Sequence, residues 1–287
     1  MEHTLHLAPR FGLCNRIRAI HAAIGLSQHL NRPLKIYWIK SNGLAAPYTN
    51  LFKNTTAFSL VECKRLPLIM ADGGPRQWYL PNLVRKVLRT TYFSTGHMNT
   101  IARSQISLKT LIPANKPVYL SSNSNFFDNE SPLHWLQPQD YLQERIDTFT
   151  QPFTAFTLGL HIRRTDHLQA TKHSPLPLFF EKIDRHFDLY DNANCYIATD
   201  CQEVKLKMVA RYGNRIISSP QQAVRNSLEG MRHAVVELFA LSRTSTIIGS
   251  YLSSFSEVAA AIGGIPLTEV YTQAQSLHKH PSLGKTA

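Results

Sequence analysis

The second half of the chain alternates strand-like and helix-like stretches, and this alternation constrains the fold more than any other feature. Short apolar runs are each followed by a longer stretch whose apolar residues recur at helical spacing. Such units predict a parallel sheet covered by helices, in which ligands gather at the carboxyl ends of the strands. In chain order the stretches are FTLGLHI, LPLFFEKIDRHF, CYIATD, QEVKLKMVARY, RIIS, SLEGMRHAVVELFALS, STIIG and SSFSEVAAAIGG.

The first half opens in the same way, with a strand-like HTLHL, a glycine-containing loop, a helix-like run over 16–30 and a second strand PLKIYWI. KPVYLSS reads as a further strand and YLQERIDTF as a helix, whereas 41–117 shows only short periodic pieces. We therefore predict an α/β protein with two Rossmann-like, doubly wound domains. A hinge near Gln151 and Pro152 would divide it into 1–150 and 151–287.

The composition is that of a globular protein that does not need disulfide bonds. The 287 residues are 43% hydrophobic and 17% charged, which is enough to bury a core without disulfides. The four cysteines form no CxxC pair, so we expect free thiols. No run reaches the roughly 18 apolar residues of a membrane helix, and the start MEHTLHLAPRFG does not resemble a signal peptide. We expect a cytoplasmic protein.

The chain is strongly basic, with 31 Lys and Arg against 19 Asp and Glu, a formal net charge of +12. Such a charge favours anionic partners, whether nucleic acid, a membrane surface or phosphorylated small molecules. The basic residues are dispersed and no RNA-binding signature is present, which argues against nucleic acid. That class is kept as an alternative, and peripheral association with the inner membrane surface is compatible with the charge.

The stretch GLHIRRTDH places His161, Arg163, Arg164 and Asp166 at the carboxyl end of a strand. Guanidinium groups at the edge of a core need an anionic partner, and their planar fork suits a pair of phosphate oxygens. The alternative is that the two arginines form surface ion pairs with Asp166 or Asp200. A phosphate site at this strand end is the prediction.

Two further candidates lie downstream. Ser253 and Ser254 precede an apolar helix, where a hydroxyl and free N–H groups can hold a phosphate; the alternative is simple capping. Glu237 lies on a helix, and a carboxylate can accept two hydrogen bonds at once, as from N1–H and the exocyclic amine of guanine. For Glu237 the alternative is a solvated or salt-bridged side chain.

In the first half, RFGLCNRIR places Gly12 in a loop and Asn15, Arg16 and Arg18 at the start of a helix. The glycine would let a ligand approach the backbone, and the polar residues could contact it. The pattern is neither GxGxxG nor a Walker loop, so it is a weak phosphate signal.

These segments together resemble a known family. GLHIRRTD, YIATD and SLEGMRHAVVELFALSRTSTIIGSYLSSFSEVA resemble the nucleotide-binding half of the α1,6-fucosyltransferases and the nodulation fucosyltransferase. GLCNRIRAIHAAIGLSQHLNRPLKIYW is similar to the amino-terminal loop and helix of the wider superfamily, which includes α1,2-fucosyltransferases and protein O-fucosyltransferases. The resemblance covers 12–38 and most of 156–264. It leaves out 41–117, where acceptor specificity is expected.

The resemblance implies a GT-B fold with two domains facing a cleft, a GDP-sugar donor and an inverting, metal-free transfer. Arg163 matches the arginine of the HxR motif that binds the β-phosphate, and Arg164 matches its neighbour. Ser253 matches a phosphate-binding serine, Glu237 falls where the family has a guanine-binding aspartate, and His161 matches a histidine near the guanine. The family relation thus implies that the anionic partner is a pyrophosphate.

The sequence departs from the family pattern where a catalytic base is expected. The α1,6 enzymes have a lysine after HxRRTD and a glutamate four residues later, and these positions are His167 and Thr171 here. Asp166 and His167 are the remaining candidates for the base. We expect transfer of fucose or a similar hexose to a glycan or glycolipid hydroxyl, without a cofactor or metal. The alternative is a protein that binds sugar nucleotides but has impaired catalysis.

Overall fold

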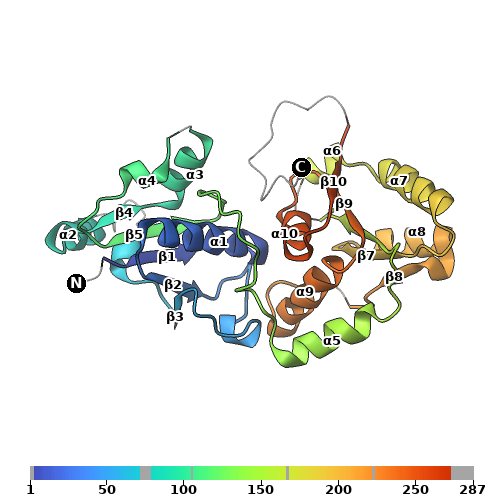
Figure 1. Cartoon of the computed structure of the whole chain (residues 1–287), viewed down its shortest axis with the longest axis horizontal. Helices are drawn as coiled ribbons and strands as arrows, with labels where there is room; N and C mark the ends of the chain where they lie inside the picture. The colour runs from blue at the N-terminus through green and yellow to red at the C-terminus, as the bar shows by residue number, and fades with distance from the viewer. Residues whose placement is uncertain (1–2, 72–78, 105, 166–167, 222–223, 273–287) are drawn as a thin grey trace. The chain divides into compact units, whose positions relative to one another are not determined.

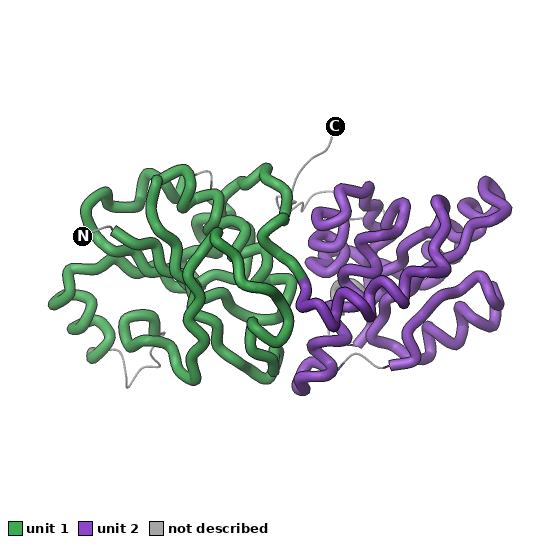
Figure 2. Tube along the Cα trace, turned by 60° about the horizontal axis from the view of Figure 1, so that its bottom comes forward, with its two compact units in different colours: residues 1–137, 286 green, residues 138–285, 287 purple. Residues whose placement is uncertain are grey.

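The protein is described by a computed structural model that covers residues 3–71, 79–104, 106–165, 168–221 and 224–272. It contains two parallel sheets, each of five strands. The chain divides between Gln137 and Pro138 into two compact units (Figures 1 and 2). The predicted α/β class is confirmed.

The sheet of the first unit has the strand order β3-β2-β1-β5-β4. HTLHL, PLKIYWI and KPVYLSS correspond to β1, β2 and β5, and the predicted helix over 16–30 is α1, which begins earlier, at Leu13. Alternate residues of β2 are buried, as expected for a strand covered more on one face. The elements are β1 Leu5–Pro9, α1 Leu13–Leu30, β2 Leu34–Ile39, η1 Tyr48–Asn50, β3 Ser59–Cys63, η2 Leu68–Met70, α2 Tyr79–Val87, β4 Thr91–Phe93, α3 Thr95–Arg103, α4 Leu108–Leu111 and β5 Val118–Ser122.

The sheet of the second unit has the order β10-β9-β6-β7-β8. Its central strands β6 and β7 are buried along their whole length, which explains their near-continuous apolar sequences. The predicted alternation of strands and helices is confirmed, with α6 and the edge strand β10 added to it. The elements are α5 Asp140–Thr150, β6 Leu158–Ile162, α6 Leu168–His173, α7 Leu176–Leu189, β7 Cys195–Thr199, α8 Gln202–Tyr212, η3 Gly213–Arg215, β8 Ile216–Ser218, α9 Leu228–Leu241, β9 Thr246–Ser250, α10 Ser254–Gly263 and β10 Leu267–Val270.

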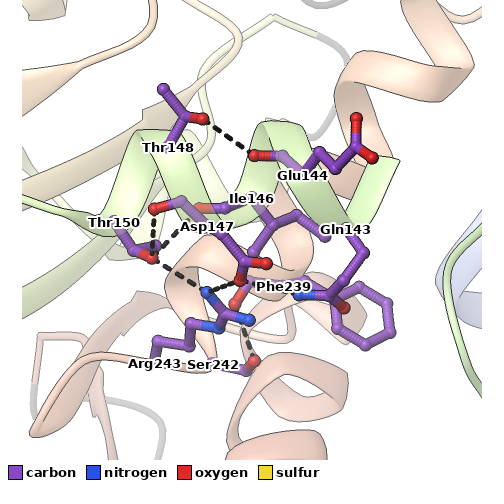
Figure 3. Close-up of polar contacts among 9 residues, drawn as sticks. All are labelled: Gln143, Glu144, Ile146, Asp147, Thr148, Thr150, Phe239, Ser242 and Arg243. Atoms are coloured by element: carbon purple, nitrogen blue, oxygen red, sulfur yellow. Dashed lines mark hydrogen bonds and ion pairs between the residues drawn. The ribbon is translucent and has the colours of Figure 1, made fainter. Parts of the chain in front are cut away.

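Helix α5 belongs to the second unit and packs against α9 (Figure 3). The Arg243 guanidinium, just after α9, lies 2.7 Å from Asp147 Oδ1 and donates to Thr150 Oγ1 over 2.9 Å. These contacts tie the end of α5 to the end of α9. The boundary expected near Gln151 therefore falls after a helix that already belongs to the second unit.

All four cysteines are free thiols, as predicted. Among the described residues, no helix combines the length and the apolar character needed to cross a membrane.

Candidate functional site

The end of β6 and the start of α10 meet at the buried His161. His161 Nδ1 lies 3.0 Å from Ser253 Oγ, and the imidazole stacks on the Phe255 ring with 4.8 Å between centroids. Burial, reinforced by the charge of Arg163, lowers the pKa of His161 to about 3. His161 is therefore neutral near pH 7, and it joins two segments that the sequence associates with phosphate.

Arg163 follows directly after β6 and is half-buried. Its backbone N–H donates to Ser250 Oγ at the end of β9, over 3.1 Å. Since Ser253 lies just beyond the same strand, Arg163 and Ser253 are held at one corner of the sheet. An arginine and a helix N-terminus at one corner are features of the kind that phosphate-binding sites use.

Asp200, at the end of β7, organises the loop that carries Arg163. Its carboxylate accepts from the Arg164 N–H at 2.8 Å, the Thr165 N–H at 3.2 Å and the Thr165 hydroxyl at 2.7 Å. In the sequence, Asp200 was only a candidate partner for an arginine side chain. Its acceptance of backbone N–H groups could not be read from YIATD alone.

Arg164 points into the protein. Its guanidinium donates to the Ser174 carbonyl over 2.8 Å and to the Arg163 carbonyl over 3.3 Å, and it lies 5.9 Å from the Phe179 ring centroid. Burial lowers its pKa. These contacts give Arg164 a role in bracing the loop behind Arg163.

Ser253 precedes α10 as its N-cap, yet its side chain caps no N–H group of the described helix. The hydroxyl is instead engaged with His161. Leu252, just before it, has a φ of 52°, a left-handed conformation that is unusual for a leucine. Strained residues of this kind cluster at ligand sites. Ser254, the other serine predicted here, is the first helical residue of α10.

Glu237 lies on α9 and lines a pocket of about 430 Å³ in the second unit. The side chain is buried, and its Oε1 lies 3.4 Å from Nε2 of His233, which is also buried. Tyr196 of β7 lines the same pocket. Glu237 is thus neither solvated nor on the surface, and the sequence reading overlooked both of its neighbours.

The residues predicted in the first unit lie around the start of α1. Arg16 is buried and donates to the carbonyls of Phe11 at 2.8 Å and Ile39 at 2.7 Å. Asn15 Oδ1 accepts from Arg18 over 3.3 Å. A Cβ at Gly12 would meet only the Gly43 carbonyl, at 4.0 Å, so packing within the described residues does not require a glycine there.

Two candidate bases, Asp166 and His167, lie outside the described residues. Thr171, which takes the place of the family's glutamate, donates its hydroxyl to the Arg164 carbonyl over 3.0 Å. In the part of the chain that the structure describes, no group of three His, Cys, Asp or Glu side chains could hold a metal ion.

Comparison with solved structures defines the fold as that of GT-B fucosyltransferases. The NodZ fucosyltransferase from Bradyrhizobium aligns with a TM-score of 0.63 at 16% identity, covering 90% of this chain and 93% of that one. POFUT1 in complex with GDP aligns with 0.55 at 12%, covering 94% and 99%. An Arabidopsis thaliana FUT1 mutant in complex with GDP aligns with 0.64 at 14%, covering 99% and 73%.

No family model and no curated protein sequence matches the chain. At these identities the likeness is one of fold. The predicted GT-B architecture, with its two parallel sheets, is confirmed.

Proposed function

We propose that this protein is a glycosyltransferase that moves fucose or a similar hexose from a GDP-sugar to a hydroxyl of a glycan or glycolipid. The observation that carries the proposal is the corner of the second sheet, where the Arg163 N–H donates to Ser250 and His161 contacts Ser253. Similar structures include NodZ soaked with GDP-fucose and POFUT1 in complex with GDP, which supports a GDP-sugar as the donor. We assign donor binding to the second unit and acceptor binding to the first.

In the proposed reaction the acceptor hydroxyl attacks the anomeric carbon in line, a C–O bond forms, and the bond to the β-phosphate breaks. Arg163 and the N-terminus of α10 at Ser253 stabilise the negative charge that develops on GDP. The anomeric configuration inverts, and these groups replace a divalent cation. Glu237 accepts hydrogen bonds from guanine, and the acceptor proton passes to Asp166 or His167.

Ligand-dependent melting tests the donor class. GDP should raise the melting temperature by mass action, whereas UDP, ADP and DNA should not. A screen of donor hydrolysis across GDP- and UDP-sugars then identifies the sugar. A shift with DNA and none with GDP would favour the nucleic-acid alternative and overturn the proposal.

Chelation tests the absence of a metal. Transfer should persist in EDTA because a guanidinium and a helix terminus neutralise the phosphates. Activity that vanishes with EDTA and returns with Mn²⁺ would contradict this part of the proposal.

The base can be tested by substitution. Asp166→Asn or His167→Gln, whichever removes the base, should lower turnover by about 10² or more while GDP affinity holds. Normal turnover in both variants would place the base elsewhere.

A second candidate function is sugar-nucleotide binding without efficient transfer. It is favoured by Thr171, whose hydroxyl is engaged with the backbone of the Arg163 loop and which carries no acid. GDP binding without hydrolysis or transfer of any donor would support this candidate.

A further inference from the structure

The pocket beside α9 contains three buried polar atoms: the Tyr196 hydroxyl, His233 Nε2 and Glu237 Oε1. None of them forms a hydrogen bond with any residue that the structure describes. A buried polar group without a partner costs about 1–3 kcal/mol. Three of them around one pocket indicate that the pocket is built for a polar ligand.

His233 and Glu237 lie one helical turn apart and face each other. The 3.4 Å between His233 Nε2 and Glu237 Oε1 exceeds the roughly 2.7–2.9 Å of a charge-assisted hydrogen bond. Both atoms therefore retain capacity for a ligand. Burial, aided by the charge of Glu237, raises the pKa of Tyr196, so its hydroxyl stays protonated.

The wall of this pocket is held in place from behind. Lys205 of α8 is buried, and its Nζ donates to the carbonyls of Ser219 at 2.8 Å and Gln221 at 3.0 Å. Ser219 and Gln221 line the pocket. Phe149 and Val236 supply apolar sides, which suit the faces of a planar base.

The order of donor and acceptor along the helix matches one nucleobase edge. Guanine presents an acceptor O6, then the donors N1–H and N2–H₂, whereas adenine presents a donor and then an acceptor. An imidazole protonated on Nε2 is a donor, and the carboxylate next to it accepts twice.

We propose that His233 is a second specificity-determining residue, which donates from Nε2 to O6 of guanine while Glu237 accepts from N1–H and the 2-amino group. This inference rests on the proposed function and adds a residue to its donor site. Uracil matches only the first two positions of this array, because its third is an acceptor that faces the carboxylate.

Calorimetric titration with GDP, IDP and ADP separates the contribution of His233 to binding from that of Glu237. IDP keeps O6 and N1–H but lacks the 2-amino group. His233→Leu should weaken GDP and IDP by the same factor, about tenfold or more for one buried hydrogen bond. Its ADP affinity should not fall. His233→Gln, which retains a donor, should recover part of the lost affinity.

The double variant His233→Leu/Glu237→Gln controls for the carboxylate that loses its neighbour, and melting without ligand reports its folding. Arg232→Gln, one residue away on α9 and in contact with Tyr141 and Glu229, is the matched control and should bind GDP normally. Normal GDP affinity in His233→Leu, or equal losses for ADP, would overturn the inference. If the wild type binds GDP no better than ADP and UDP, the proposed function itself fails.

Discussion

The loops that follow the central strands β1 and β6 both carry arginines, but they are braced in opposite ways. In the first unit the brace is an arginine: Arg16 is buried and holds the carbonyls of Phe11 and Ile39. In the second unit an acid from the next strand, Asp200, holds the loop by its N–H groups. The two loops thus differ in whether an arginine side chain or an acid side chain fixes the backbone.

Arg16 illustrates why residue type alone does not define a site. Its guanidinium also donates to Ser41 Oγ over 3.2 Å and lies 4.8 Å from the Trp38 ring centroid. Burial and the charge of Arg10 lower its pKa to about 10, which still leaves it protonated at neutral pH. The sequence predicts both Arg16, as part of a weak phosphate signal, and Arg163, as the main phosphate ligand, and the two differ in burial: Arg16 is buried and Arg163 is half-buried.

The largest effect is expected at Arg163. Arg163→Lys keeps the charge but replaces a planar, two-pronged donor with a single ammonium. We expect a loss of transition-state stabilisation of roughly 3 kcal/mol or more, seen in turnover rather than in GDP affinity. Paired measurements of turnover and melting temperature test this. Near wild-type turnover would remove the distinction between the two loops.

Arg16→Met should mainly lower stability, whereas the Arg163 variant should mainly lower turnover. It leaves two carbonyls without their buried donor, so the free energy of unfolding should fall by about 3 kcal/mol. Urea denaturation measures the change, and Lys substituted at the same position should restore only a part. A variant that unfolds normally but fails to bind GDP would assign Arg16 to the donor site instead.

Lys205→Met tests the contacts of the buried Lys205 ammonium with the carbonyls of Ser219 and Gln221. The carbonyls of Ser219 and Gln221 lose a charged donor, and we expect about 2 kcal/mol of destabilisation. Because these residues line the Glu237 pocket, GDP affinity should fall as well. Lys207→Met, an exposed residue on the same helix with an ion pair to Glu203 at 4.0 Å, is the control and should change neither quantity.

The pH dependence of stability should include one histidine from each unit, the half-buried His6 and the buried His161. Burial lowers the pKa of His6 to about 4 and that of His161 to about 3, from 6.5. Below pH 6.5 the unfolded chain binds protons that the folded chain does not, so stability is lost as the pH falls. His161 should contribute about 1 kcal/mol per pH unit between pH 6 and 4.5, and the half-buried His6 should contribute less because solvent screens its charge. His6→Gln and His161→Gln should each flatten the curve in that window.

A strand could be predicted from the sequence where its own residues carry a clear apolar pattern. β6 and β7 are buried on both faces, so their apolar runs were sufficient to predict them. β4 has three residues and β10 has four, too few for a periodic signal. The corner at Ser253 followed from the strand and helix pattern.

The contacts of the candidate site that could not be predicted from the sequence join residues that are far apart along the chain. Lys205 reaches Ser219 and Gln221, and Asp200 reaches Arg164, only because the sheet brings neighbouring strand ends together. His233 is different. It stands four residues before Glu237 on a helix, and that spacing was available as a signal.

The three hydrogen bonds that Asp200 accepts have an entropic consequence. They order the Arg163 loop in the folded chain itself, so the conformational entropy of that loop is lost during folding and not again when a ligand arrives. Were Asp200 replaced by alanine, only a fraction of molecules would present Arg163 correctly. The apparent dissociation constant of a ligand would rise in inverse proportion to that fraction, although no group that contacts the ligand had changed.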